Sequence, residues 1–296
     1  MGIVAPASAI DREALQAGCA RLAQLGYKPV YLDSIFDTDL YFAGTLDRRL
    51  AELEEMFAQD DVKAIICARG GYGCNYLLDR LNLDVIRSHP KVFVGYSDVS
   101  TLLTHITQST GLVTFHGPMV TKDFAVQGGV DECAWRAAIS GMTSFGIAPE
   151  AWVRPLVDGA ADGIISGGCL SMLAASLGTK YEVQTKGTIL FIEDIGTKPY
   201  QIDRMLMQMR LAGKFDGVRG IVFGEMRDCA QPGGQAYSLD EVLVRIVGDL
   251  GIPVAAGVRS GHVERFNVTI PFGVRGYLRV MNGKVEFGTS EAAVTG

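Results

Sequence analysis

The sequence lacks long apolar runs and a leader segment. Its longest uncharged apolar stretch, Ile164 to Gly178, contains Gly and Ser and falls short of the roughly 18 residues that a membrane-spanning helix needs. The N-terminus, MGIVAPAS, has neither the basic region nor the long apolar core of a secretory signal. We therefore expect no membrane anchor and a protein that stays in the cytoplasm.

Cysteine and histidine are scattered. The sequence has no CxxC pair, no HExxH motif and no Cys/His spacing typical of a zinc site. We therefore predict that the protein needs no metal and no cofactor, and that its cysteines are reduced and buried. The six cysteines are Cys19, Cys67, Cys74, Cys133, Cys169 and Cys229.

A net positive charge is also missing. Lysine and arginine total 27 against 33 acidic residues, a formal charge of -6, so no basic field attracts nucleic acid or an anionic membrane. The composition is otherwise that of a globular protein: 296 residues, 48% hydrophobic, with 36 glycines and no internal repeat. Such a chain can bury a sizeable core, and its glycines suit strand-to-helix turns.

In the first half, short apolar runs alternate with helical patterns. Helices are predicted at residues 11–25, 46–58, 75–81 and 99–107, and strands at the apolar runs between them. Strands that alternate with helices form parallel sheets. We therefore predict an α/β fold with a Rossmann-like or flavodoxin-like N-terminal domain over residues 1–138.

The second half has a different pattern. Residues 139–163 contain Pro and Gly without periodicity, and we interpret them as a linker. Residues 164–296 contain several strands with hairpin-like turns, which predicts a β-rich, barrel-like C-terminal domain. A helix at 199–212 has four apolar residues at the spacing of one buried face. These residues are Ile202, Met205, Leu206 and Met209.

Ser97 lies where the apolar run VFVG enters a turn and a helix follows. A serine there is presented at the carboxyl edge of the sheet, and the free N–H groups of the following helix face any oxyanion beside it. The GxSxG pattern of a nucleophile elbow is incomplete, because Val99 occupies the place of the second glycine. A serine at a helix start is also a common N-cap, so the local sequence leaves both roles open.

A nucleophilic serine needs a base, and the sequence offers His262 in the loop SGHVERFN. This histidine follows an apolar run and is free to face a cleft, although a plain exposed histidine is the alternative. Glu193 ends the run TILFIE and is the candidate acid that orients the imidazole. The alternative for Glu193 is that acids at strand ends often cap the next helix, here the one that begins near Pro199, and Asp194 can take that role. The remaining histidines are His89, His105 and His116.

The segment ARGGYG, residues 68–73, closes another apolar run with paired glycines. Glycines let a backbone approach a ligand closely, but the Lys-Ser/Thr of a P-loop and the GxGxxG spacing are missing. An oxyanion donor or a substrate clamp is as plausible here as a nucleotide site. Cysteine chemistry at Cys67 or Cys74 is a further alternative, but neither has a base nearby in the sequence and both are predicted to be buried.

Seven segments, in this order, resemble the signature blocks of the LD-carboxypeptidases, also called muramoyltetrapeptide carboxypeptidases: VAPAS, ARGGYG, GYSD, HGPM, ISGGCLSML, FIEDIGTKPYQIDRML and GHVERFNVTIPFG. The resemblance implies a catalytic triad of Ser97, Glu193 and His262. It also implies an oxyanion hole formed by the backbone amides of Asp98 and Gly71. The implied fold has an N-terminal domain similar to class I glutamine amidotransferases and a β-rich C-terminal domain, and a homodimer is expected.

The activity that the resemblance implies is a serine peptidase reaction. The enzyme would cut the amide between diaminopimelate and the terminal D-alanine of cell-wall tetrapeptides, in peptidoglycan recycling. Such an enzyme must bind a terminal carboxylate, and Arg69 and Arg265 are candidates by position, with structural ion pairs as the alternative. Thr197 stands where many relatives have Glu, which leaves fine specificity open.

Two other functions compete with this one. A relative of the microcin C immunity peptidase would cleave a peptidyl-nucleotide amide and would need an aromatic pocket for the nucleobase. The aromatic residues are too dispersed in the sequence to indicate such a pocket. A non-catalytic module would bind an anionic peptide without turnover, and its binding would survive the loss of Ser97.

Overall fold

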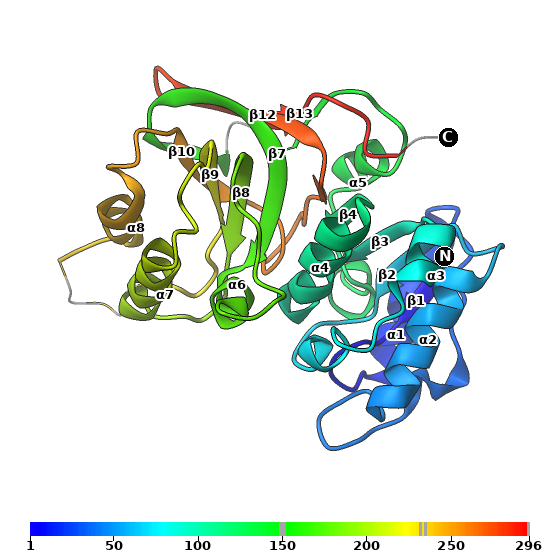
Figure 1. Ribbon diagram of the computed structural model, residues 1–296. Helices are drawn as coiled ribbons and strands as arrows, with labels where there is room; N and C mark the ends of the chain where they lie inside the picture. The colour runs from blue at the N-terminus through cyan, green and yellow to red at the C-terminus, as the bar shows by residue number, and fades with distance from the viewer. Residues whose placement is uncertain (148–151, 231–232, 234–235, 295–296) are drawn as a thin grey trace.

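The computed structural model describes all residues except 148–151, 231–232, 234–235 and 295–296. The described residues form two sheets with helices packed on them, which confirms the predicted mixed α/β fold class (Figure 1). Among these residues, no helix has both the length and the apolar character of a membrane span.

The first sheet has the strand order β1-β2-β3-β4-β11, in which the first four strands are parallel. Its strands are β1 (Gly2–Val4), β2 (Ala64–Cys67), β3 (Val92–Gly95), β4 (Thr114–His116) and β11 (Ile270–Phe272). The last of these comes from the C-terminal half and runs antiparallel to β4, with Ile270 opposite His116. A strand from the far end of the sequence thus completes the N-terminal sheet.

The helices of the first half are α1 (Arg12–Gln24), α2 (Leu46–Ala58), α3 (Leu83–Ser88), α4 (Ser100–Thr110) and α5 (Glu132–Ala138). Asp11 and Thr45 cap α1 and α2 with their side chains, as residues of these types do at helix starts. The predicted helix at 75–81 is reduced to the short turn η2 (Cys74–Tyr76). The apolar run around Val30 makes a single bridge to Gly2 instead of a strand.

The second sheet has the order β5-β13-β12-β7-β8-β9-β10-β6. Its strands are β5 (Phe145–Gly146), β6 (Arg154–Val157), β7 (Gly159–Cys169), β8 (Thr188–Glu193), β9 (Gly220–Gly224), β10 (Val254–Val258), β12 (Arg275–Met281) and β13 (Lys284–Thr289). The strands β7 to β10 are parallel and the outer ones antiparallel. Residues 139–163, interpreted above as a linker, carry strands of the second sheet: β5, β6 and the start of β7. The division of the chain into two domains at this segment stays a prediction.

Three helices cover one face of the second sheet: α6 (Leu170–Ser176), α7 (Pro199–Leu211) and α8 (Leu239–Val247) (Figure 1). In α7, Ile202, Leu206 and Met209 are buried as the spacing predicts, and Met205 is half-buried. The hydrophobic core of the first sheet continues into the other face of the second sheet. The two sheets are therefore held together by one continuous core.

The cysteine prediction is only partly correct. All six cysteines are free, and Cys67, Cys74, Cys169 and Cys229 are buried. Cys19 is half-buried on α1, and Cys133 is exposed. Cys133 is exposed because it lies on the solvent side of the amphipathic helix α5, whose buried side carries Trp135 and Ala138.

Candidate active site

Ser97 occupies a sharp turn between β3 and α4. Its backbone φ is +63°, a left-handed conformation that residues with a side chain adopt rarely and that is concentrated at functional sites. A Cβ atom on Gly95 would lie 2.6 Å from Cγ1 of Val99. The valine side chain therefore fills the space above Gly95, which explains why the turn tolerates Val99 where an elbow usually has glycine.

Glu193, at the end of β8, is paired with His262. The Nδ1 atom of His262 lies 2.7 Å from Oε2 of Glu193, and the backbone N–H of His262 donates to the same oxygen at 3.1 Å. A T-shaped contact with the Tyr96 ring, at 5.1 Å between centroids, fixes the imidazole from the side. Because Nδ1 is committed to Glu193, Nε2 is the ring nitrogen left to act in the cavity.

Burial and charge act in opposite directions on this pair. Burial alone would raise the pKa of Glu193, but the charge and hydrogen bond of His262, together with the nearby His116 ring, outweigh it and lower that pKa to about 2. Burial would likewise lower the pKa of His262, but the Glu193 carboxylate raises it above its ordinary value. The Lys122 ammonium works against this increase. The pair is therefore a carboxylate beside an imidazole of increased basicity.

His116, at the end of β4, is a residue of this site that the sequence analysis did not select. It is fully buried, its Nδ1 lies 2.8 Å from the Ser260 hydroxyl, and its Nε2 lies 3.7 Å from Oε1 of Glu193. Burial lowers the pKa of His116 despite the nearby carboxylate, which favours the neutral ring. The HGPM block contains this histidine, but the local sequence gives no sign that it faces Glu193.

The loop that carries His262 is anchored by buried polar side chains. Asn267 accepts the Gly261 N–H at 3.0 Å and donates to the Gly261 carbonyl at 3.1 Å. Its amide also donates to Asp123 at 3.1 Å, and Asp123 accepts the Met119 N–H at 2.8 Å. Burial raises the pKa of Asp123 to about 6. This network ties the His262 loop to the π-helical turn η4 (Val120–Phe124).

The paired glycines of ARGGYG lie against the turn that carries Ser97. A Cβ on Gly70 would lie 2.8 Å from Cβ of Ser97 and 3.1 Å from its Oγ. Gly71 has a φ of +109° and packs against the Ser8 side chain. Among the described residues, the backbone N–H groups of Gly71 and Asp98 have no hydrogen-bond acceptor. Both donors belong to segments that border Ser97.

The Asp98 side chain connects these two segments. Its Oδ2 accepts the Cys74 N–H at 2.8 Å, and burial raises the pKa of the carboxyl. The same burial raises the pKa of the Cys67 and Cys74 thiols well above the ordinary value. Thiolates are therefore disfavoured at both cysteines, which weakens the cysteine alternative.

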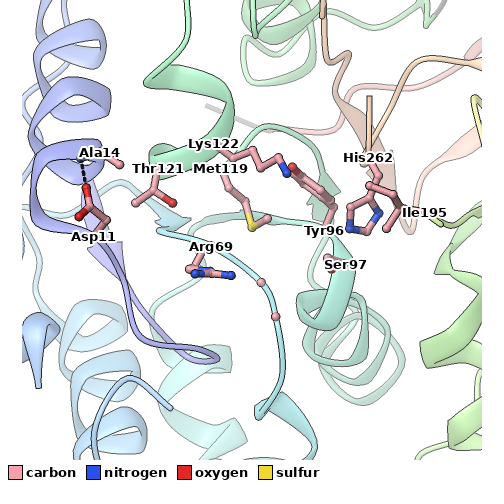
Figure 2. Close-up of a pocket in the computed structure, with 12 residues that line it drawn as sticks. Asp11, Ala14, Arg69, Tyr96, Ser97, Met119, Thr121, Lys122, Ile195 and His262 are labelled. Atoms are coloured by element: carbon pink, nitrogen blue, oxygen red, sulfur yellow. Dashed lines mark hydrogen bonds between the residues drawn. The ribbon is translucent and has the colours of Figure 1, made fainter. Parts of the chain in front are cut away.

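Ser97 and His262 lie at one end of a cavity of about 430 Å³ (Figure 2). Arg69 lines its middle and Asp11 its other end, and the Lys122 side chain extends from η4 toward Tyr96 and His262. Arg265, the other predicted carboxylate ligand, is exposed and is not among the residues that line this cavity. Lys122 was missed because a single lysine in a turn carries no recognisable signal.

Thr197 and Asp194 are hydrogen-bonded to each other next to the Glu193–His262 pair. Asp194 accepts hydrogen bonds from the Ser171 N–H at 2.9 Å and the Thr197 hydroxyl at 3.0 Å. Asp194 thus holds the first turn of α6, and not α7 as the sequence suggested. The Thr197 hydroxyl is bonded to Asp194, and Thr197 is not among the residues that line the cavity.

One group of described residues has the proximity of metal ligands: Cys169, Glu193 and His262, whose donor atoms lie within 4.8 Å of one another. Burial raises the pKa of the Cys169 thiol well above its ordinary value, which disfavours the thiolate that a metal needs. Glu193 and His262 are already bonded to each other. The donor set therefore fits a hydrogen-bonded pair better than a metal.

Comparisons with known proteins identify similar domains in both halves of the chain. Residues 1–117 match the family described as LD-carboxypeptidase N-terminal domain, and residues 162–278 match the LD-carboxypeptidase C-terminal domain. A Bacillus subtilis protein named "Probable murein peptide carboxypeptidase" is 37% identical over 99% of this chain and 93% of its own. The Escherichia coli microcin C7 self-immunity protein MccF is 30% identical over 92% of this chain and 87% of its own.

A solved structure shares the whole fold. The muramoyltetrapeptide carboxypeptidase from Oxalobacter formigenes is 27% identical, with a TM-score of 0.86 over 99% of this chain and 100% of that one. The similarity therefore extends over both sheets and over every segment that contributes to the cavity.

Proposed function

Because the chain belongs to the LD-carboxypeptidase family, we propose that it is a serine carboxypeptidase that removes the terminal D-alanine from cell-wall tetrapeptides in peptidoglycan recycling. The bond cut joins the L-centre of diaminopimelate to D-alanine. The observation that carries the proposal is the 2.7 Å contact between His262 and Glu193 in the cavity that Ser97 lines. The homologues named as murein peptide carboxypeptidases support the substrate class.

In the proposed mechanism, Nε2 of His262 takes the Ser97 proton while Oγ attacks the carbonyl carbon of the third residue. His262 then gives this proton to the leaving nitrogen, the carbon–nitrogen bond breaks, and D-alanine departs. Water, deprotonated by His262, then attacks the acyl-serine ester. The bond between the carbonyl carbon and Oγ breaks, His262 returns the proton to Oγ of Ser97, and the tripeptide leaves with a new carboxylate. Glu193 holds the imidazole in the tautomer that leaves Nε2 free to accept, and stabilises the imidazolium.

The tetrahedral intermediate needs donors for its oxyanion. The N–H groups of Asp98 and Gly71 border Ser97 and have no other acceptor among the described residues. Asp98 lies in the turn Ser97–Val99 that leads into α4, so the positive end of this helix also faces the developing charge. We assign the oxyanion hole to these two amides.

The leaving D-alanine carries the terminal carboxylate. His262 delivers the proton to the leaving nitrogen, so this residue of the substrate lies on the His262 side of Ser97. Lys122 lines the cavity and is close enough to His262 to oppose its protonation. We assign the terminal carboxylate to Lys122, and leave Arg265 without a role because it is exposed away from the lining of the cavity.

The family resemblance also supports a cytoplasmic homodimer. Gel filtration with light scattering measures the mass of the native protein directly. A mass of one chain at micromolar concentration would contradict the dimer and leave the catalytic proposal untouched.

The test of the function is release of free D-alanine from the tetrapeptide L-Ala-γ-D-Glu-diaminopimelate-D-Ala in the presence of a chelator. We expect release by the wild type and a loss of about 10³-fold or more in Ser97→Ala. Ser88→Ala, at the exposed end of α3, is the control for a serine removed elsewhere. Full activity in Ser97→Ala, or none in the folded wild type, overturns the proposal.

One observation favours a second candidate, the peptidyl-nucleotide hydrolase. The fold brings Tyr41, Tyr72 and Tyr76 around Phe42, with the Phe42 ring centroid 4.4, 5.9 and 5.4 Å from theirs. These tyrosines are exposed, and Tyr72 follows the Gly70–Gly71 segment that lines the cavity. Aromatic faces of this kind stack on nucleobases. Hydrolysis of an aminoacyl sulfamoyl adenosine faster than the tetrapeptide would favour this function.

A further inference from the structure

The cavity extends well beyond the catalytic residues, and its far end is charged. Figure 2 shows Asp11 at the end opposite Ser97 and His262, with Arg69 between them. Asp11, Ala14 and Arg69 all line the same cavity as Ser97. The reaction described above uses neither Asp11 nor Arg69, so both charges remain to be explained.

Arg69 is held in place without an acidic partner. Its Nη1 donates to the Ala9 carbonyl at 3.2 Å, and among the described residues no carboxylate lies within ion-pair distance of its guanidinium. The other N–H groups of the guanidinium remain available. An arginine fixed by a backbone carbonyl and left without a counter-ion in a cavity is suited to a carboxylate of the substrate.

Asp11 offers the opposite charge in a fixed position. Its Oδ1 accepts the Ala14 N–H at 2.8 Å as the cap of α1. Among the described residues Oδ2 has no partner and the carboxylate forms no ion pair. The capping bond limits the motion of the side chain, so the second oxygen is presented in one direction. This oxygen can accept a hydrogen bond from an ammonium group.

We propose that Asp11 and Arg69 form a subsite that binds a zwitterionic side-chain end on the third residue of the substrate, the ammonium at Asp11 and the carboxylate at Arg69. This inference rests on the proposed function. With the scissile carbonyl at Ser97, the side chain of the acyl residue can extend along the cavity to Arg69 and Asp11. The side chain of diaminopimelate has this form: a methylene stem that ends in one ammonium and one carboxylate.

The subsite discriminates between diaminopimelate and lysine by charge. A lysine side chain brings its ammonium to Asp11 but leaves the Arg69 guanidinium unpaired. A cationic side chain also meets the repulsion of Arg69, with no carboxylate to offset it. Asp11 and Arg69 are both exposed, so the preference is set by the contact with the Arg69 guanidinium that a lysine side chain cannot make.

The experiment compares kcat/KM for D-alanine release from three tetrapeptides that differ only in the third residue: diaminopimelate, diaminopimelate with its side-chain carboxyl as a carboxamide, and lysine. For the wild type we expect diaminopimelate to exceed both others by about tenfold, the value of one charge-assisted contact. In Arg69→Gln, which keeps a donor for Ala9, the ratio of the acid to the carboxamide should fall to about one. Equal rates for all three peptides in the wild type overturn the subsite.

Asp11→Asn tests the other half of the subsite and keeps the helix cap, because Asn caps as well as Asp. It should lower kcat/KM for all three peptides by about tenfold, while a norleucine peptide, which has no ammonium, stays unchanged. Glu13→Gln, an exposed acid on the same helix, is the control for the loss of one charge. An equal loss with the norleucine peptide would contradict the role of Asp11.

Binding separates this proposal from the proposed function. Calorimetry with Ser97→Ala measures affinity for the diaminopimelate and lysine peptides without turnover. A preference of about tenfold for diaminopimelate supports the subsite even if the wild type releases no D-alanine. Equal affinities overturn the subsite even if the wild type is an active carboxypeptidase.

Discussion

The Nε2 atom of His116 lies 3.7 Å from Oε1 of Glu193, and neither atom has a hydrogen-bond partner among the described residues. Both side chains are buried. The distance is slightly too long for a hydrogen bond, and a small displacement would satisfy both orphaned atoms. The Ser260 hydroxyl is 2.8 Å from Nδ1 and 3.3 Å from the His116 carbonyl oxygen. When it donates across the shorter contact to Nδ1, Nε2 carries the proton and can donate to Glu193. His116 is thus positioned to orient the acid, as Glu193 orients His262.

Replacing His116 by Phe should lower kcat with little change in KM. The ring would still pack between Phe191 and Phe272, but the donor to Glu193 would be lost. A hydrogen bond to a charged group is worth about 1.5–3 kcal/mol, which corresponds to roughly ten- to a hundredfold in rate. The carboxylate would become more basic, so the acid limb of the pH profile should move to higher pH. Steady-state kinetics as a function of pH measure both effects.

His116→Gln is the matched variant, because its amide can reach toward Glu193 as a donor. It should recover part of the activity and return the acid limb toward that of the wild type. If His116→Phe and His116→Gln lose activity equally, without a change in the pH profile, His116 has a packing role only.

The pH profile of the wild type follows from the raised pKa of His262. Below that pKa the ring is protonated and cannot accept the Ser97 proton. The value of kcat/KM should therefore increase with pH through a pKa above about 6.5, the ordinary value for histidine. In Glu193→Gln, burial acts without the carboxylate, so the limb of the residual activity should move to lower pH. A limb that stays in place would show that Glu193 does not control His262.

The same pair makes stability depend on pH. The folded pKa of His262 is raised, so its contribution is complete below about pH 6.5 and is lost as pH increases through the folded value. Glu193, at about 2 in the folded protein, contributes above its unfolded value of about 4.3 and loses this contribution as pH falls toward 2. Thermal unfolding of the wild type and Glu193→Gln at several pH values measures the difference, which should be largest between these limits.

Gly261→Ala should damage both stability and activity. The residue has a φ of +92°, and a Cβ there would lie 2.7 Å from Cδ of Glu193 and 2.8 Å from Cε1 of His116. Gly251→Ala is the control: it has a φ of +68° with nothing near the added atom. The control should cost about 1 kcal/mol from backbone strain, and Gly261→Ala should cost at least about 2 kcal/mol more. Equal unfolding free energies for Gly261→Ala and Gly251→Ala would mean that Glu193 and His116 can move aside for the added atom at little cost.

Gly70→Ala should act mainly on Ser97. The added Cβ would lie 2.8 Å from Cβ of Ser97 and 3.3 Å from the Tyr96 carbonyl oxygen. D-alanine release should fall by about a hundredfold or more, because the hydroxyl is displaced from its attack position. In the double variant Gly70→Ala/Ser97→Gly the clash is relieved, and a double-mutant cycle of unfolding free energies should give a coupling of about 1 kcal/mol or more. Additive free energies would place Gly70 farther from Ser97 than the structure has it.

The sequence predicted local features of the fold well. The alternation of apolar runs and helical patterns predicts the parallel strands and α1, α2 and α4, because those elements bury one face at a regular spacing. The turn at Ser97 follows from the same pattern. The incomplete elbow could not be judged from sequence, since the compatibility of Val99 with Gly95 depends on how the turn closes.

Relationships between distant segments could not be predicted from composition or periodicity. Only the family resemblance linked Glu193 to His262, and their catalytic roles stay predictions. His116 looks like any strand-end residue until β11 pairs with β4. The sequence also could not show that Lys122 lines the cavity and Arg265 does not, because this depends on the paths of the two segments that carry them. Pairings of high sequence separation have no local signature.

The strand β11 has a consequence for when the activity can first exist. His262 lies on the chain that leaves β10 in the second sheet and enters β11 in the first. A growing polypeptide emerges from the ribosome at about 5–20 residues per second, with Ser97 exposed long before Ile270 is synthesised. The first sheet is completed only when β11 docks beside His116, and the same step delivers His262 to the cavity. Under the proposed mechanism, a nascent or truncated chain that ends before β11 would therefore carry Ser97 with nothing to hold His262 at the cavity, and would not cut peptides before its fold is closed.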